Sequence, residues 1–352
     1  MRLSRRGLLW GVAALSASAA ALAVARQPIS RLSVKWPGLE ARVRRIGYLS
    51  SNPSGRGELD PFLQGLSELG YAEGRDYALQ TRYAELHYEK APALAAELVA
   101  TEPDVVLTEA YPATQAAKDA TAEAAGIGKP PIPVVFVLVT DPIGLGLVAS
   151  LAKPGGNITG LSTLSPALSN KRMELLKAVA PDVKRVGVLH DPSNPSTLAI
   201  FNQTASAGEA LGLDVSSIPV RLLDDADGAR AAALAARVGA LMPLPATVFQ
   251  VAELHKRLVE FAAQNRMVIV STDRGSPPAS ADGVLLAVGP GYTRIFRRAA
   301  DYVDKIFKGA QPADLPVEQP TTFDVMVNLK VAQALGLSIP PEVAEQVTEW
   351  IR

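Results

Sequence analysis

Residues 45–53 read RIGYLSSNP, and residues 185–195 repeat the pattern as RVGVLHDPSNP. Each copy has a short apolar segment, which predicts a β-strand, followed by a polar loop with proline and then by a helical pattern. The two helices end alike, with LGY at residues 69–71 and LGL at residues 211–213. The repeat therefore predicts two α/β halves of similar plan. Because open parallel sheets bind ligands at the carboxyl ends of their strands, we expect a two-lobed clamp around a small molecule.

Strand and helix patterns alternate along both halves, which predicts parallel sheets. The expected fold class is α/β, with two Rossmann-like lobes joined by a hinge. One helix is expected from Asp141, as its N-cap, to about Leu151, and a last helix over residues 323–335. The predicted strands cover residues 46–50, 77–83, 105–108, 134–139, 185–190, 214–220, 239–243, 267–271 and 284–287.

The composition excludes several classes of protein. The chain of 352 residues has 35 Lys and Arg against 35 Asp and Glu, so its net charge of zero gives no basis for general binding of nucleic acids or anionic membranes. The absence of cysteine excludes disulfides, thiolate metal sites and thiol nucleophiles. We therefore expect no nucleic-acid partner, no metal site and no cofactor.

The first 25 residues resemble an export signal. They combine a basic start, an alanine-rich apolar run over residues 8–24 and small residues suited to cleavage near Ala23 or Ala25. The pair Arg5-Arg6 fits a twin-arginine signal, and the whole segment also fits a general secretory signal, so both routes stay open. We expect a periplasmic protein in which residues 26–43 form a linker.

Two sequence patterns resemble parts of enzyme active sites, but each lacks a feature that the active site would need. The stretch GLGLVA at residues 144–149 loosely matches a dinucleotide-binding loop, but no acidic residue follows where the ribose would need one. His190 and Asp191 are adjacent, so their side chains would point to opposite faces of a strand, which argues against a catalytic pair. We expect no catalytic residues.

Polar residues at the predicted strand ends are the candidate ligand contacts. A ligand carboxylate would suit the helix N-terminus expected after Thr140, with Asp141 turned back onto its own helix. An α-amino group would suit Asp191. Arg274 follows a strand and is either a bidentate clamp for a carboxylate or a solvated surface residue. The candidates found in this way also include Ser51, Asn52, Tyr111, His190 and Asn194.

Several motifs together resemble the substrate-binding proteins of ABC transporters, a family whose characterised relatives bind tryptophan and other aromatic amino acids. The resemblance extends over about residues 44–342. The motifs are FLQGLSELGY at 62–71, DPIGLGLVASLAKPGGNITGLS at 141–162, KRMELLK at 171–177, ADLPVEQPT at 313–321 and NLK at 328–330.

The resemblance implies the type I fold of periplasmic binding proteins, with two lobes, three crossover strands and hinge closure on a ligand. The crossovers would lie near residues 157–162, 284–289 and 315–320. The N-terminal lobe would comprise residues 44–160 plus about 288–318, and the C-terminal lobe residues 161–287 plus about 319–345. The ligand contacts that it implies lie near Ser51, Tyr111, Thr140, Asp191, Asn194, Thr247 and Thr272 to Arg274.

The chain departs from the family pattern at three of these places. It has EAYP at residues 109–112 where a small residue, Thr and Pro are common, His190-Asp191 where Trp-Asn is common, and Val288 where an aromatic residue is common. Aromatic amino acids are therefore only the first candidate for the ligand.

The function expected is that of an exported, monomeric, non-enzymatic solute-binding protein. It would capture a small carboxylate-bearing ligand and deliver it to an inner-membrane ABC permease with a cytoplasmic ATPase. Two alternatives stay open. One is a ligand-sensing lobe for a membrane receptor, which would use the same clamp. The other is an exported two-lobed enzyme, although thiol-dependent racemases of that plan need the cysteines that this chain lacks.

Overall fold

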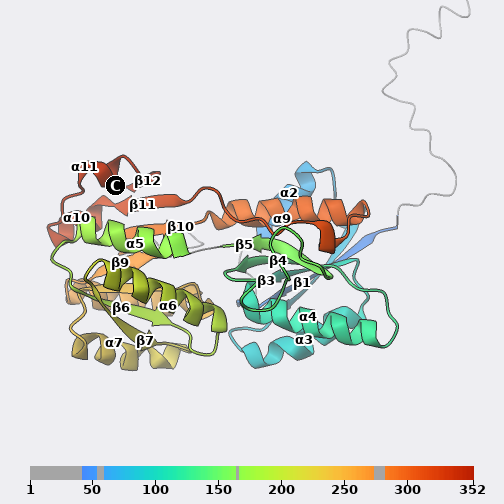
Figure 1. The fold of residues 1–352 in the computed structure, drawn as a ribbon, viewed down its shortest axis with the longest axis horizontal. Coiled ribbons are helices and arrows are strands. Elements are labelled where there is room, and N and C mark those ends of the chain that lie inside the picture. Colours follow the sequence, from blue (N-terminus) through green and yellow to red (C-terminus); the bar gives the residue numbers. More distant parts are fainter. Residues whose placement is uncertain (1–41, 54–58, 164–165, 273–281) are drawn as a thin grey trace, which may run out of the picture. The chain divides into compact units, whose positions relative to one another are not determined.

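The structure is a computed structural model, and it describes residues 42–53, 59–163, 166–272 and 282–352. The predicted export signal and all but the last two residues of the predicted linker lie outside these ranges, as does Arg274. Residues Val43–Arg352 form one compact unit. Within this unit the chain builds two sheets, and we call each sheet with its helices a lobe (Figure 1).

The first lobe contains a five-stranded parallel sheet in the order β2-β1-β3-β4-β5. Its central strands are apolar and fully buried, as expected for parallel strands covered on both faces. The strands are β1 (Arg44–Ser50), β2 (Tyr77–Tyr83), β3 (Val105–Glu109), β4 (Val134–Val139) and β5 (Ile158–Ser162).

Helices cover both faces of this sheet. On one face lie α3 (Ala91–Ala100) and α4 (Ala110–Gly126), and on the other lie α2 (Asp60–Glu68) and α9 (Tyr292–Phe307) (Figure 1). The helix α9 comes from far along the chain and packs closely on α2. A Cβ atom at Gly65 would lie only 2.8 Å from the Cβ atom of Ala300, so only glycine permits this approach.

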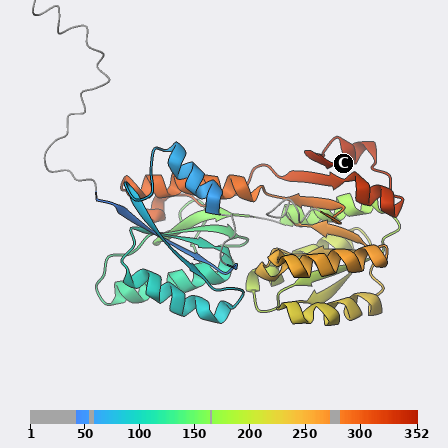
Figure 2. The ribbon, with the colours of Figure 1, turned by 180° about the vertical axis from the view of Figure 1, so that it is seen from behind.

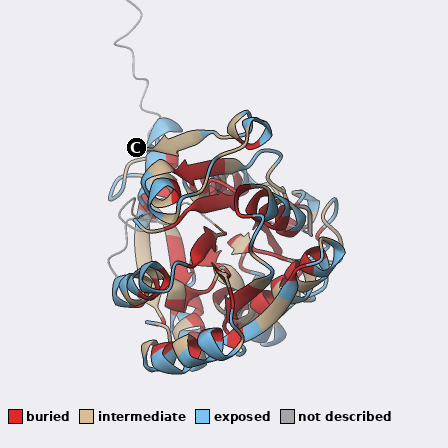
Figure 3. Cartoon of the chain, turned by 90° about the vertical axis from the view of Figure 1, so that its left-hand side faces the viewer, coloured by how far each residue is buried: buried red, intermediate tan, exposed pale blue. Residues whose placement is uncertain are grey.

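The second lobe contains a seven-stranded sheet in the order β12-β11-β10-β9-β8-β6-β7. Its strands are parallel except that β10 and β11 pair in antiparallel fashion. Figure 3 shows buried strands inside exposed outer helix faces. The strands are β6 (Arg185–His190), β7 (Asp214–Pro219), β8 (Ala240–Pro243), β9 (Val268–Ser271), β10 (Leu286–Gly289), β11 (Asp324–Asn328) and β12 (Glu349–Ile351).

Two layers of helices enclose the second sheet. One hydrophobic cluster joins the sheet to α5 and α6, and a second joins its other face to α7 and α8 (Figure 2). The helices are α5 (Pro166–Val179), α6 (Pro195–Ala210), α7 (Ala226–Ala235), α8 (Ala252–Gln264), α10 (Leu329–Leu335) and α11 (Pro341–Ala344), with short 3₁₀ turns η4 (Leu223–Asp225) and η5 (Thr247–Gln250).

The chain passes three times between the lobes. It leaves β5 for α5, leaves β10 for α9, and returns after the 3₁₀ turn η7 (Pro312–Asp314) to β11. On the return it lies beside β5, because the amide of Ser162 donates to the carbonyl oxygen of Glu318 at 2.9 Å.

The predicted helix over residues 141–151 is wrong, because this segment forms a series of turns. Gly146 adopts φ +69°, a left-handed conformation that interrupts a helix, and its amide donates to the carbonyl oxygen of Ile143. Gly146, one of the two glycines that suggested a closely packed helix start, thus interrupts the helix.

The predicted helix over residues 323–335 is wrong in its first half. Residues 324–328 form β11, and the helix α10 begins only after Asn328, whose side chain accepts from the amides of Lys330 and Val331. The segment is a strand because β10 offers it an antiparallel partner, with Val325 opposite Val288. This pairing makes the second sheet mixed, whereas a parallel sheet was predicted.

Candidate ligand-binding site

The ten described candidate residues all lie at, or follow, the carboxyl ends of strands. In the first lobe they come after β1, β3 and β4, and in the second after β6, β8 and β9. All of them except Tyr111 and Asp141 are buried. Tyr111 stands in the first turn of α4 and packs partly against the core between that helix and the sheet.

A buried carboxylate organises the loop after β1. Glu109, at the end of β3, is 3% exposed. Its Oε2 accepts from the hydroxyl of Tyr48 at 2.6 Å and from that of Ser50 at 2.7 Å, and its Oε1 accepts from the Asn52 amide group. Glu109 therefore fixes Asn52 in place. This role of Glu109 was not predicted, because its only sign in the sequence is an acidic residue at the end of an apolar strand.

Ser51 lies at the centre of this loop. Its side chain is completely buried, and its Oγ has no hydrogen-bond partner among the described residues. Buried polar atoms in folded proteins nearly always have a partner, so this hydroxyl is suited to contact a bound molecule.

The corresponding loop after β6 begins with a neutral histidine. Burial lowers the pKa of His190 below its usual value, although the neighbouring Asp191 carboxylate opposes the shift. The Nε2 atom lies 2.7 Å from the Ser217 hydroxyl, and the ring centroid lies 5.1 Å from that of Phe201. The buried Nδ1 has no hydrogen-bond partner within the described ranges.

Asp191 and Asn194 hold the rest of this loop. The Oδ1 of Asp191 accepts from the amide of Ser193 at 2.8 Å and from its hydroxyl at 2.6 Å. Asn194 is the N-cap of α6, and its Oδ1 accepts from the amide of Ser196 at 3.0 Å. Asp191 is 1% exposed, which makes it a deeply placed negative charge at a strand end.

Tyr88 connects the first lobe to these second-lobe residues. It lies in the 3₁₀ turn η3 (Tyr88–Lys90), and its hydroxyl is 2.7 Å from the Oγ1 of Thr247. Burial raises the pKa of Tyr88, and the Asp191 carboxylate raises it further, so the hydroxyl keeps its proton. No sequence pattern singles out this tyrosine, because its role depends on a contact between residues 159 positions apart.

A small cavity brings residues of both lobes together at the strand ends. Its volume is about 10 Å³, which is room for about one water molecule. Thr140 and Thr272, both candidates from the sequence, line it together with Arg172, which the sequence analysis did not select. The other lining residues are Thr163, Ile200, Pro245, Pro290 and Tyr292.

The helix N-terminus expected after Thr140 is absent, so it cannot hold a carboxylate. Asp141 does turn its side chain back, but onto a turn, where its Oδ1 accepts from the amide of Gly144 at 2.8 Å. The Thr140 hydroxyl lies 3.3 Å from that of Thr163.

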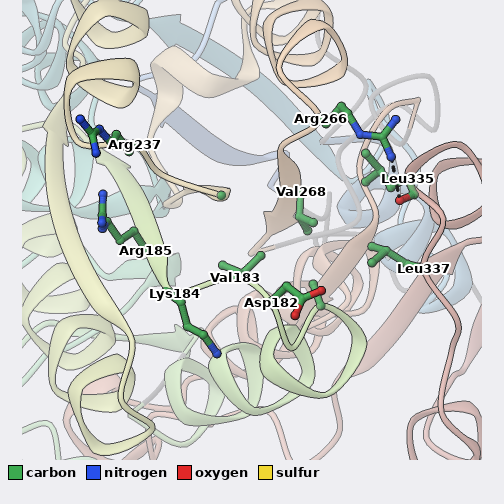
Figure 4. Close-up of a pocket in the computed structure, with 11 residues that line it drawn as sticks. Asp182, Val183, Lys184, Arg185, Arg237, Arg266, Val268, Leu335 and Leu337 are labelled. Atoms are coloured by element: carbon green, nitrogen blue, oxygen red, sulfur yellow. Dashed lines mark hydrogen bonds between the residues drawn. The ribbon is translucent and has the colours of Figure 1, made fainter.

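A second hollow lies at the opposite, amino-terminal edge of the second sheet (Figure 4). Three of the four cationic side chains that line it donate to carbonyl oxygens near helix ends: Arg185 to Ala236 at 3.3 Å, Arg266 to Leu335 at 3.3 Å and Lys184 to Pro181 at 3.0 Å. Helix C-termini carry a partial negative charge, so helix capping accounts for these three cations. Ligands of parallel sheets bind at the other edge.

No cluster of three or more potential metal ligands occurs among the described residues. Within the same ranges, no helix has the length and apolar character needed to cross a membrane.

Comparison with known proteins gives a consistent result. The family model described as ABC transporter substrate binding protein matches residues 48–351. A curated relative, the tyrosine-binding protein of Clostridioides difficile strain R20291, is 24% identical over 293 residues, which is 83% of this chain and 80% of the relative.

Solved structures share the fold. The ABC domain from Streptococcus pneumonia in complex with L-Trp has a TM-score of 0.77 and 26% identity, over 88% of this chain and all of that one. The ligand-free, open structure of a substrate binding protein with adhesive properties from Clostridium difficile has a TM-score of 0.61 and 21% identity, over 88% and 99% of the two chains. The likeness confirms the predicted two-lobed α/β fold.

Proposed function

Since the chain belongs to the family of ABC transporter substrate binding proteins, we propose that it captures an amino acid, with aromatic amino acids as the first candidates. The family is non-catalytic, so the chain is the solute-binding protein of an ABC transporter and not an enzyme. The relatives support the narrower proposal, since one is called a tyrosine-binding protein and another is complexed with L-Trp.

One observation supports this proposal most strongly. The repeated strands β1 and β6 both end in buried polar atoms that lack hydrogen-bond partners among the described residues, namely Ser51 Oγ and His190 Nδ1. Asp191, beside the second of these, carries a buried negative charge. A ligand with an ammonium group and further polar atoms would supply partners to both loops, and an amino acid has these groups.

Export and delivery are further parts of the proposal. The family implies a binding protein outside the cytoplasm. We place it in the periplasm as a monomer, with residues 1–25 as its signal, and we assign delivery to a permease with a cytoplasmic ATPase. Replacing Arg5 and Arg6 by Lys should stop export through the twin-arginine route and leave general secretory export largely intact. N-terminal sequencing of periplasmic material that shows Met1 retained would contradict cleavage.

Ligand binding is tested by calorimetry together with mass spectrometry of small molecules that co-purify with the protein. We expect L-tryptophan or L-tyrosine to bind, and tryptamine or indole-3-propionate, which each lack one charged group, to bind far more weakly. Small-angle scattering should show a smaller radius of gyration with ligand, because a ligand that contacts both lobes favours the closed form. Tight binding of a molecule without a carboxylate would refute the proposal.

A further inference from the structure

One short turn of the first lobe reaches the candidate binding residues of the second lobe. The turn is η3, and the hydroxyl of its Tyr88 lies 2.7 Å from the Oγ1 of Thr247. Asp191 and Asn194 also lie beside this hydroxyl, and they are buried, as is Thr247. Their surroundings contain little water, which makes a hydrogen bond stronger. This bond joins the two lobes directly.

We propose that η3 latches the two lobes together, with the bond between Tyr88 and Thr247 as its main contact. The closed arrangement is then stabilised by the protein itself as well as by a ligand. This inference goes beyond the proposed function, because it concerns the protein before a ligand binds and does not depend on which ligand the cleft takes. A ligand completes a closure that part of the population already reaches.

The segment before the turn is fixed to the loop after β1 in its own lobe. The amide of Leu86 donates to the carbonyl oxygen of Ser51 at 3.0 Å. Glu85 and Leu86 have φ values of +53° and +68°, a left-handed conformation that costs free energy in residues other than glycine. Such strain persists only where the surrounding structure requires it, and it is typical of switch segments. The strained pair directly precedes the turn that carries Tyr88 to the second lobe.

A pair of opposite charges adds to this contact. Hydrogen bonds from its own backbone amide and from His87 lower the pKa of Glu89, and the positive charge of Arg221 in the second lobe lowers it further. Glu89 is exposed, so salt screens this attraction, which is weaker than the buried bond of Tyr88. The charge pair nevertheless acts in the same direction, since it also joins η3 to the second lobe.

The latch lies on the side of the molecule away from the hinge. The three passages between the lobes run through the upper half of Figure 1, whereas α7 and α3, which begins directly after η3, lie along its lower side. Contacts far from a hinge separate most when two lobes rotate apart. Breaking these contacts therefore favours the open arrangement.

The distance between the lobes of the ligand-free protein tests the latch. Since the chain has no cysteine, spin labels can be attached specifically at Ile127→Cys, which follows α4, and at Leu234→Cys in α7. Both side chains are exposed, and both helices lie on the lower side of Figure 1. Double electron–electron resonance should show a short and a long distance, which correspond to the closed and the open arrangement.

Tyr88→Phe removes the hydroxyl and keeps the ring. It should lower the ratio of closed to open protein about two- to tenfold, as expected for the loss of one hydrogen bond. Tyr71→Phe is the matched control, because the hydroxyl of Tyr71 bonds to Asp304 within the first lobe. It should leave the ratio unchanged. The Tm of each labelled variant shows that the protein remains folded.

The charge pair gives a second test. Glu89→Arg and Arg221→Glu should each shift the ratio toward the open form, by less than Tyr88→Phe does, and the two changes together should restore it. Both residues are exposed, so their replacement should leave the protein folded. A double variant that is more open than either single variant would contradict an attraction between the two residues.

Three results would overturn the latch. They are a ligand-free protein that shows only the long distance, a Tyr88 variant with an unchanged ratio, and a Tyr71 variant with an equal shift. Failure of L-tryptophan and L-tyrosine to bind would instead refute the aromatic form of the proposed function. It would leave the latch standing, because each of these distances is measured without ligand.

Discussion

The loops after β1 and β6 belong to the two copies of the repeated sequence pattern, yet the acidic group in each lobe makes different contacts. In the first lobe the carboxylate is Glu109, which comes from a neighbouring strand and accepts hydrogen bonds from Tyr48, Ser50 and Asn52. In the second lobe the carboxylate is Asp191, which belongs to the loop itself and whose charge raises the pKa of Tyr88 from the other lobe. One acid stabilises its own lobe, and the other is placed where two lobes meet.

Replacing Glu109 is the most direct test of its role in stabilising the first lobe. Glu109→Ala would leave three buried donors without their acceptor, so we expect the free energy of unfolding to fall by about 3 kcal/mol or more. Chemical denaturation measures this loss. Glu97→Ala is a control, since Glu97 forms an exposed ion pair with Arg82 and should change stability by less than about 1 kcal/mol. A small loss at Glu109 would mean that its network does not hold the loop.

Asp191 should show the opposite behaviour. A charge-assisted hydrogen bond contributes about 1.5–3 kcal/mol, so Asp191→Ala should weaken an amino-acid ligand by about one to two decades in Kd. Calorimetry with L-tryptophan measures the effect. Unchanged affinity would mean that no ammonium group binds there, and a simple organic or aromatic acid would then be the better candidate.

Tyr88 tests whether the contact between the lobes matters for binding. Tyr88→Phe removes the hydroxyl that bonds to Thr247, which we expect to weaken ligand binding about two- to tenfold. Tyr71→Phe is the matched control. Its hydroxyl bonds to Asp304 within the first lobe at 2.9 Å, so its loss should affect stability but not affinity. Equal effects of both variants on affinity would argue against a special role for Tyr88.

The smallest expected effect concerns pH. Burial lowers the pKa of His190 in the folded protein, so the unfolded chain takes up a proton first as the pH falls below about 6.5. His190 should therefore make the protein less stable in mild acid than near pH 7. His190→Gln should reduce this dependence when Tm is measured across that range. An unchanged slope would show that His190 does not titrate differently in the two states.

The sequence predicted the general plan well, because that plan depends on local patterns. The repeat and the alternation of strands and helices indicated two α/β lobes, and strand ends located candidates such as Ser51 and Asp191. One error is local, since the left-handed conformation of Gly146 interrupts the helix predicted over residues 141–151. The other errors arose where contacts with residues far along the chain determine the structure. The segment 324–328 is a strand because β10 lies beside it, and Arg172 is buried because strands about 100 residues later supply its carbonyl acceptors. Tyr88 likewise owes its role to Thr247.

The position of α9 has a consequence for synthesis of the chain. This helix covers one face of the first sheet, with Phe296 and Val303 in the same core as Val105 and Leu107. About 150 residues separate the end of β4 from the start of α9. At about 5–20 residues per second, the ribosome takes about 8–30 seconds to produce them. During that time only α2 covers this face of the first sheet, and exposed apolar surface favours aggregation, so we expect chaperones to bind the nascent protein until α9 emerges.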